Sequence, residues 1–276
     1  KSQMCWDGRY VWVLNAGEKG PLAVIEPKQA KVRTFGPESG LPPSTSCGVA
    51  PLGPGKVCLA GYFGRLWVAL ATFNPSTGMK LEVIHEARAT PGTFDWNDNS
   101  PERHSPKLAE PITFVTTLTA PAAAGEPARQ RVVVGRHGPD PFSGPGPLIV
   151  DPESKSVTSA LSGCPCPSLS HGDALYWQPK LGNPNTLYRV GFPDFKKELI
   201  NNAWPRSACV FFEGNFHLLG PGYYLAPGPK GPLRRLQCDM PGGRVEPDFS
   251  QVSLSNHYGL LVSTQQGVYR VELKTP

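Results

Sequence analysis

Long apolar stretches and helical periodicity are what this 276-residue sequence lacks. No apolar run approaches the roughly 20 residues that a membrane-spanning helix needs, so we expect no membrane span. No window keeps apolar residues at positions i, i+3, i+4 and i+7 over three turns, so we expect almost no helix. The nucleophile motif G-x-S-x-G and the phosphate-binding P-loop are also absent. We therefore expect the protein to use no cofactor.

Metal-binding patterns are scarce too, although the sequence contains seven cysteines. Cys164 and Cys166 form a C-x-C pair, but a metal site there would need two further ligands, and no C-x-x-C or H-x-x-x-H pair is present. His85-Glu86 begins like the zinc motif H-E-x-x-H, but residue 89 is Ala. That segment predicts an outer strand, and we expect no metal site.

Four other cysteines (Cys5, Cys47, Cys58 and Cys209) lie inside apolar runs. A buried thiol in such a run packs as a small hydrophobic group. Cys47 and Cys58 lie on adjacent strands of one predicted hairpin and could approach each other, which leaves a disulfide open. We favour buried thiols over that disulfide.

The charge of the chain is modest and evenly spread. The 27 Lys and Arg residues exceed the 22 Asp and Glu residues, which gives a net charge of +5. A nucleic-acid-binding protein usually concentrates its basic residues on one face. Because the basic residues are spread along the whole chain, we expect no nucleic-acid partner.

What the sequence does have is a repeat of short strands separated by turns. Runs of about four to six residues, rich in Val, Leu and aromatic residues, alternate with turns that draw on 32 Pro and 30 Gly. Six runs are variants of one another, and the best of them contains Gly-Arg-Leu-Trp-Val. They span residues 20–27, 64–70, 146–152, 185–190, 222–227 and 267–271.

Each of the six runs is preceded by two further strand-like runs, and five are followed by a fourth, more polar one. Four strands repeated about every 40–45 residues are typical of a β-propeller blade. The sequence therefore predicts one all-β domain over residues 1–276, a six-bladed β-propeller with four-stranded antiparallel blades. The first strand of each blade should line the central channel, and the fourth should lie at the rim.

Two irregularities leave alternatives open. The interval between the second and third copies is nearly double, and its excess, residues 88–111, is polar and contains several prolines. We interpret it as a long loop, although a seventh blade within residues 86–131 is the alternative. The last blade is incomplete, so either side-chain contacts close the ring or the chain was cut from a longer polypeptide. The lack of an initiating Met favours processing or excision.

Two unusually long connections contain the candidate site residues. One lies within residues 88–111, ahead of the third blade, and the other spans residues 136–144, between its second and third strands. Both should lie on the same face of the propeller. The residues that they bring together are Asp95, Trp96, Asp98, His104, Arg136, His137 and Asp140.

This set of side chains could bind a polar ligand. Trp offers a stacking surface, Arg pairs with a carboxylate or phosphate, and carboxylates accept hydrogen bonds from hydroxyl groups. Long loops also tend to carry function. The alternative is that these loops are polar because they are solvated, with Asp and Asn forming local turns.

The segment from residue 32 to residue 70 resembles the repeat of two-component-regulator propellers. The likeness rests on Gly40-Leu41-Pro42, on residues 56–61 and on Gly64-Arg65-Leu66-Trp67-Val68. It weakens beyond residue 110, and Ala23, Ile149 and Tyr188 replace the Trp in other blades. The resemblance implies a bacterial, extracytoplasmic, sensor-like module that binds ligands or partners and is not itself an enzyme.

Taken together, we predict a binding or scaffold module that recognises a small polar ligand or a protein partner on the face with the two long loops. An alternative is a carbohydrate lyase or hydrolase that uses His104 or His137 with Asp95, Asp98 or Asp140. A third possibility is a structural subunit of a larger assembly. Propellers host all of these functions, so the fold alone does not choose among them.

Overall fold

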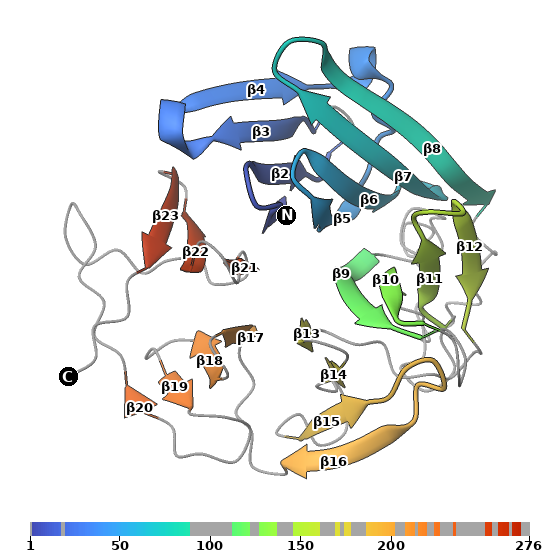
Figure 1. Cartoon of the computed structure of the whole chain (residues 1–276), viewed down its shortest axis with the longest axis vertical. Helices are drawn as coiled ribbons and strands as arrows, with labels where there is room; N and C mark the ends of the chain where they lie inside the picture. The colour runs from blue at the N-terminus through green and yellow to red at the C-terminus, as the bar shows by residue number, and fades with distance from the viewer. Residues whose placement is uncertain are drawn as a thin grey trace, which may run out of the picture.

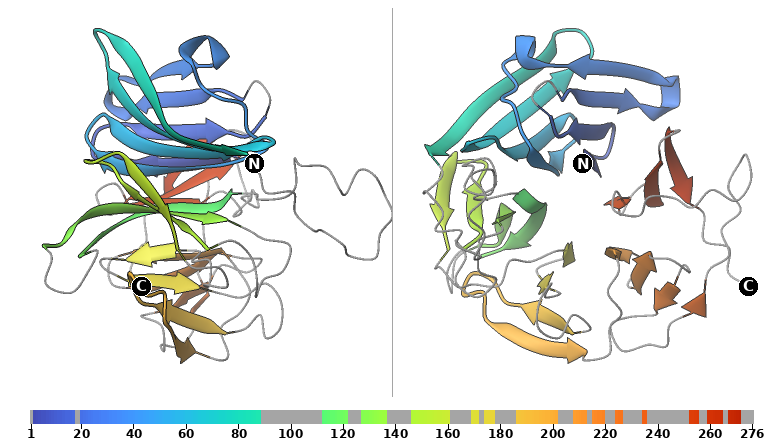
Figure 2. Two further views of the ribbon diagram at one scale, coloured as in Figure 1. Left: turned by 90° about the vertical axis from the view of Figure 1, so that its right-hand side faces the viewer. Right: turned by 180° about the vertical axis from the view of Figure 1, so that it is seen from behind.

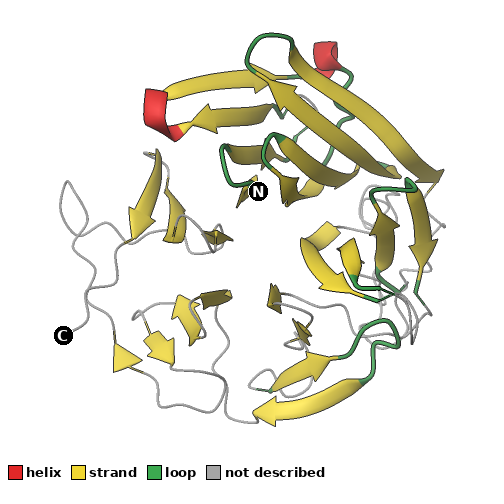
Figure 3. Ribbon diagram, in the orientation of Figure 1, coloured by secondary structure: helices red, strands yellow, loops and turns green. Residues whose placement is uncertain are grey.

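The computed structural model of the chain is almost entirely β-structure. It describes residues 2–17, 20–88, 112–121, 127–136, 146–160, 169–171, 174–177 and 186–201, together with the strands between residues 208 and 271. Only two short 3-10 helices occur in these residues, η1 (Pro27–Gln29) and η2 (Pro37–Ser39) (Figure 3). Among the described residues, no helix has the length and apolar character needed to cross a membrane.

The described strands form six antiparallel sheets, which we number 1 to 6 in chain order. Sheet 1 contains β1 (Ser2–Trp6), β2 (Val11–Asn15), β3 (Leu22–Glu26) and β4 (Lys31–Phe35). Sheet 2 contains β5 (Ser46–Gly53), β6 (Lys56–Tyr62), β7 (Arg65–Asn74) and β8 (Gly78–Arg88). Sheet 3 contains β9 (Ile112–Ala120), β10 (Arg129–Arg136), β11 (Leu148–Asp151) and β12 (Ser156–Ser159).

The remaining sheets have shorter strands. Sheet 4 contains β13 (Leu169–His171), β14 (Ala174–Trp177), β15 (Leu187–Val190) and β16 (Lys197–Asn201). Sheet 5 contains β17 (Ala208–Phe212), β18 (Asn215–Leu219), β19 (Tyr224–Ala226) and β20 (Arg234–Arg235). Sheet 6 has three strands in the described residues, β21 (Val252–Ser255), β22 (Gly259–Thr264) and β23 (Gly267–Val271).

The sheets are arranged around a common axis, with their first strands innermost (Figures 1 and 2). The first strands of successive sheets contact one another in chain order, from β1 through β5, β9, β13 and β17 to β21. β21 in turn contacts β1. The fourth strands lie at the periphery, so the predicted order of strands from axis to rim is confirmed.

Because each sheet lies between two neighbours, both of its faces are apolar. On β6, Val57 and Leu59 belong to the core shared with sheet 1, whereas Cys58 and Ala60 belong to the core shared with sheet 3. Alternate residues of a strand point to opposite faces, which explains why these strands are continuously apolar rather than alternating. The fourth strands face water on their outer side, and β4 is correspondingly exposed along most of its length.

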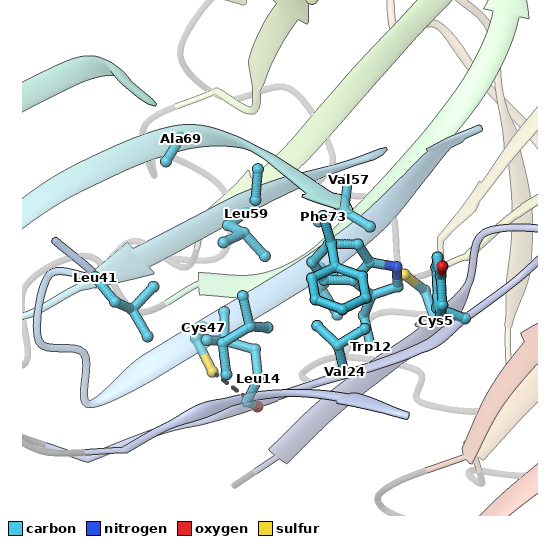
Figure 4. Packing of buried hydrophobic residues seen from close by; sticks show 14 of the residues in the cluster. Cys5, Trp12, Leu14, Val24, Leu41, Cys47, Val57, Leu59, Ala69 and Phe73 are labelled. Atoms are coloured by element: carbon cyan, nitrogen blue, oxygen red, sulfur yellow. Dashed lines mark hydrogen bonds between the residues drawn. The ribbon is translucent and has the colours of Figure 1, made fainter. Parts of the chain in front are cut away.

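Aromatic side chains fill the interface between sheets 1 and 2. The Phe73 ring meets Tyr10 and Trp12 edge to face, with centroid distances of 5.0 and 6.3 Å. Phe35 approaches the same ring at 5.9 Å. Figure 4 shows Trp12 and Phe73 within this core, together with Cys47, whose thiol lies 3.5 Å from the carbonyl oxygen of Leu14. Edge-to-face pairs of this kind add stability beyond the burial of area.

A buried carboxylate fastens the same interface at one end. Asp7 Oδ1 accepts hydrogen bonds from the backbone N–H groups of Arg9 and Tyr10, both at 2.7 Å. Its Oδ2 accepts from Trp12 Nε1 at 2.5 Å and from the backbone N–H of Gly55 at 2.8 Å. Gly55 belongs to the turn between β5 and β6, so Asp7 ties the first turn of sheet 1 to the first turn of sheet 2.

The residues that carry the family resemblance form one structural unit in sheet 2. Gly61 pairs with Trp67 across β6 and β7. A Cβ atom at Gly61 would lie 2.2 Å from Cζ2 of the Trp67 indole, so the indole needs glycine beneath it. The indole Nε1 donates to the carbonyl oxygen of Pro43 at 3.0 Å, and Leu41 is buried in the core between sheets 1 and 2. The Gly-Leu-Pro segment is therefore held against the strand that contains Trp67.

The structure corrects the suggestion that Cys47 and Cys58 approach each other. The register pairs Cys47 with Gly61 and Ala50 with Cys58, so the two cysteines point to opposite faces of sheet 2. Cys47 lies in the core shared with sheet 1 and Cys58 in the core shared with sheet 3. Burial raises the pKa of Cys47 to about 11 and that of Cys58 to about 12. Together with Cys5, these cysteines are free buried thiols.

Candidate ligand-binding site

The ends of the two long connections lie next to each other in the structure. The first connection leaves sheet 2 at Arg88, the last residue of β8, and enters sheet 3 at Ile112, the first residue of β9. The second leaves at Arg136, the last residue of β10, and returns at Gly146, shortly before β11. Ile112 and Arg136 are paired across the β9–β10 ladder. The first connection therefore ends, and the second connection starts and ends, at one end of sheet 3, which we call the loop end.

Of the seven predicted site residues, the structure describes Arg136. Asp95, Trp96, Asp98, His104, His137 and Asp140 lie outside the described residues. The stretch in which a seventh blade was an alternative also falls largely outside them. These predictions therefore stay predictions.

Arg136 is held firmly by its own sheet. Its guanidinium donates to the carbonyl oxygen of Gly146 from Nε at 3.0 Å and from Nη2 at 2.5 Å. Nη2 also donates to the Ser159 Oγ of β12 at 2.7 Å. Only 9% of the residue is exposed. Arg136 thus joins the two ends of the second connection to the rim strand of sheet 3.

The strand registers place Arg136 on the side of sheet 3 that faces sheet 2. Its cross-strand partner Ile112 and the nearby Leu148 belong to the core shared by these two sheets. Leu148 pairs with Ser159, which therefore has the same orientation. On the sheet 2 side, Ser46 Oγ accepts the backbone N–H of Ile112 at 2.7 Å. At the loop end, the apolar core between sheets 2 and 3 thus gives way to a polar cluster, with Arg136 and Ser159 toward the rim and Ser46 on the inner strand.

His85 is a member of this cluster that the sequence did not indicate as a site residue. It pairs with Val68 of β7, whose side chain lies in the core between sheets 2 and 3. Its side chain is half-buried. Burial lowers the pKa of His85, and the nearby positive charge of Arg136 lowers it further. The outer-strand prediction for this segment is confirmed, because His85 lies within β8. The sequence gives no indication that His85 lies near Arg136 of the adjacent sheet.

Near the rim, the cluster combines the Arg136 guanidinium, the His85 imidazole with its lowered pKa and the Ser159 hydroxyl, whereas Ser46 lies on β5, three strands away from His85 in sheet 2. Such groups can orient a polar ligand by hydrogen bonding, and a neutral imidazole can both donate and accept. No group of three or more His, Cys, Asp or Glu residues in the described part of the chain is arranged to hold a metal ion.

Neither a protein-family model nor a curated protein matches the sequence. Solved structures do match it. A protein of unknown function from Bacteroides thetaiotaomicron has a TM-score of 0.56 at 13% identity, with 96% of this chain and 67% of that chain covered. The Dos1 propeller has a TM-score of 0.50 at 10% identity, and the match covers 96% of this chain and 76% of the Dos1 chain.

The chain has a β-propeller fold. The four-stranded antiparallel sheets around one axis and the likeness to the Dos1 propeller agree on this point. At these identities the likeness concerns the fold alone, and propellers serve many functions. The finer resemblance to two-component-regulator propellers stays a prediction, since no family model matches.

Proposed function

We propose that this propeller has six blades and is a non-enzymatic binding module, which recognises a small polar ligand or a protein partner at the loop end between sheets 2 and 3. The observation that supports this most strongly is the adjacency of Ile112 and Arg136, where one long connection enters sheet 3 and another leaves it. Long connections grouped on a rigid scaffold are the usual place for a binding site on a repeat fold. The ring would close through packing of β21 against β1.

Within this proposal, the predicted residues divide into two groups. Asp95, Trp96, Asp98, His104, His137 and Asp140 belong to the connections and would supply stacking and hydrogen-bonding groups. Arg136 would mainly hold the ends of the second connection in place and would make little direct contact with the ligand, because its guanidinium is buried and hydrogen-bonded to Gly146 and Ser159. This arrangement favours a site whose walls are loops and whose floor is the end of sheet 3.

Asp7, in the interface between sheets 1 and 2 at the opposite end of the strands, is a polar group without hydrogen-bonding capacity to spare. Its carboxylate accepts four hydrogen bonds within the protein. A group with its hydrogen-bonding capacity used in this way has little left for a ligand. The half-buried imidazole of His85, between sheets 2 and 3, is not used in this way.

The experiment that tests the proposal replaces Trp96 and His137 together by Ala. Wild type and variant are screened by thermal shift against glucose, galactose, mannose, galacturonate and inorganic phosphate, and hits are measured by calorimetry. The double variant should fold with an unchanged midpoint and lose at least tenfold in affinity. A matched control, Lys28→Ala with Lys196→Ala, changes exposed residues in third-to-fourth-strand turns and should bind normally.

Two results would contradict the proposal. Unchanged binding by the Trp96→Ala, His137→Ala variant would place the site elsewhere on the molecule. If chromatography shows that a bound saccharide is converted into a new product, the lyase or hydrolase alternative is favoured.

A further inference from the structure

His85 is placed by an irregularity of the outer strand of sheet 2. Val68 of β7 pairs with His85, whereas the next residue, Ala69, pairs with Val83. Ile84 is therefore an extra residue in β8, which makes a β-bulge. Bulges re-aim side chains and are common beside functional sites. Here the bulge gives His85 the same orientation as Val68, toward sheet 3.

The polar atoms of this imidazole are not used by the described protein. Among the described residues, His85 makes no hydrogen bond and no ion pair. By contrast, the Arg136 guanidinium and the Ser159 hydroxyl are engaged, since Ser159 Oγ accepts from Arg136. Both nitrogens of this half-buried ring are available to a ligand. Because the ring has already lost part of its contact with water, a ligand that binds to it adds only a small further desolvation free energy.

The charge around His85 indicates what kind of group it would meet. Among the described residues, the charged group whose field acts on the ring is Arg136, and it disfavours a second positive charge. Burial and this positive charge both favour the neutral imidazole, in which one nitrogen donates and the other accepts. A hydroxyl group, which also donates and accepts, complements such a ring. Arg136 itself is too deeply buried to be the principal contact.

We propose that His85 contacts the ligand and that the ligand presents a hydroxyl group to it, as a neutral polyol or saccharide would. This inference rests on the proposed function, because it adds a residue and a ligand class to the same site. The loop end between sheets 2 and 3 would then bind neutral hydroxyl compounds in preference to simple anions.

The first arm of the test needs no ligand. The His85 ring is followed by NMR between pH 4 and 8 and assigned by its disappearance in His85→Gln. Its pKa should lie below the ordinary value of about 6.5 and rise in Arg136→Gln. Arg136→Lys retains the charge and should keep the pKa low. An ordinary pKa that does not respond to Arg136→Gln would show that the two groups do not face each other and would overturn the inference.

The second arm measures binding by calorimetry. The probes are the neutral compounds sorbitol, glucose, galactose and mannose, with acetate and inorganic phosphate as anions. We expect at least one neutral probe to bind, His85→Phe to lower its affinity at least tenfold, and His85→Gln to lose less because an amide keeps hydrogen-bonding atoms. Lys80→Ala, on the same strand but at its other end, should bind like the wild type.

The outcomes separate this inference from the proposed function. If His85→Phe binds normally while the Trp96→Ala, His137→Ala variant does not, the site stands and the role of His85 is wrong. If both variants bind normally, both proposals fail. Binding of acetate or phosphate alone, or of none of the neutral probes, would overturn the hydroxyl-ligand class.

Discussion

The interfaces on the two sides of sheet 2 are built differently. Between sheets 1 and 2, aromatic rings pack edge to face and Asp7 joins the turns of both sheets through four hydrogen bonds. Between sheets 2 and 3, the core consists mainly of aliphatic side chains, Ala and Cys58, and it ends in a polar cluster with Arg136 and His85. At the first interface the Asp7 carboxylate is fully engaged, although the buried Tyr10 hydroxyl has no hydrogen-bond partner among the described residues. The second interface leaves a half-buried imidazole, that of His85, at the loop end.

Under the proposed function, this difference would let one repeated unit serve two purposes. Close packing is needed at every interface to hold a ring together, and Gly48 contributes to it between sheets 2 and 3. A Cβ there would lie 2.3 Å from Cγ2 of Val115 on the adjoining inner strand. Function requires something else, namely polar atoms that the protein does not use itself. We therefore expect substitutions at the first interface to lower the free energy of unfolding strongly, and substitutions at the second to change how that free energy depends on pH.

The largest expected effect is at Asp7. Asp7→Ala would leave four donors without their acceptor in a nearly inaccessible place, and we expect a loss of about 3–5 kcal/mol in the free energy of unfolding. Urea denaturation would measure it. Asp194→Ala is the control, since Asp194 accepts one exposed backbone N–H, from Lys196, and its loss should cost under about 1 kcal/mol. Similar values for both variants would contradict the view that Asp7 fastens the interface.

The next effect concerns the glycine beneath the Trp67 indole. Gly61→Ala would push a methyl group into the ring, and we expect a cost of about 1–3 kcal/mol from overpacking. The same substitution in a Trp67→Leu background should cost much less, because the ring atoms that it meets are gone. Denaturation of the four proteins forms a double-mutant cycle. An equal cost in both backgrounds would mean that Trp67 is not the reason for the glycine.

A smaller effect should appear in the pH dependence of stability. The pKa of His85 is lower in the folded protein than its ordinary value of about 6.5, so the unfolded chain binds a proton more readily. The contribution of neutral His85 is therefore complete above about pH 6.5 and is lost as the pH falls toward the folded pKa. Denaturation between pH 8 and 5 should show a shallower decline for His85→Gln than for wild type. Parallel curves would argue against this linkage.

The smallest effect is expected at the rim between sheets 2 and 3. Lys155 Nζ lies 2.6 Å from Glu82 Oε1, and the ion pair lowers the pKa of Glu82, but both side chains are about half exposed. Exposed ion pairs contribute little and are screened by salt. Lys155→Ala should leave the melting temperature almost unchanged, in low or high salt. A clear, salt-dependent drop would show that this contact helps to hold the two sheets together.

The sequence was a good guide to whatever depends on local pattern. Apolar runs and turn residues placed the strands, and the polar fourth runs fell at the rim because water reaches only that edge. The strands of sheet 2 proved longer than expected, since Thr72 and Phe73 continue β7 beyond the apolar run. Gly61 and Trp67 both belong to the motif that carries the family resemblance. Only the structure shows why the two occur together, because the Trp67 indole lies over Gly61.

Relations that depend on register were beyond the sequence. The sequence predicts that Cys47 and Cys58 lie on neighbouring strands. Which face of sheet 2 each side chain points to depends on the register of β5 and β6, and no local pattern reveals that register. The sequence places His85 on an outer strand and in an incomplete zinc motif, and neither gives it a role in a site. Its orientation depends on the bulge at Ile84, and its neighbour Arg136 belongs to another sheet. Of the seven predicted site residues, the structure could place Arg136, which proved to be tied to Gly146 and Ser159.

The two long connections are proposed to meet above the interface between sheets 2 and 3. Photo-cross-linking tests this directly, with Trp96 replaced by the aromatic photo-reactive residue benzoylphenylalanine and the products mapped by mass spectrometry. We predict cross-links to peptides that contain residues 137–145 or His85. Cross-links instead to the turns at the opposite end of the strands, around residues 27–30 or 152–155, would contradict it.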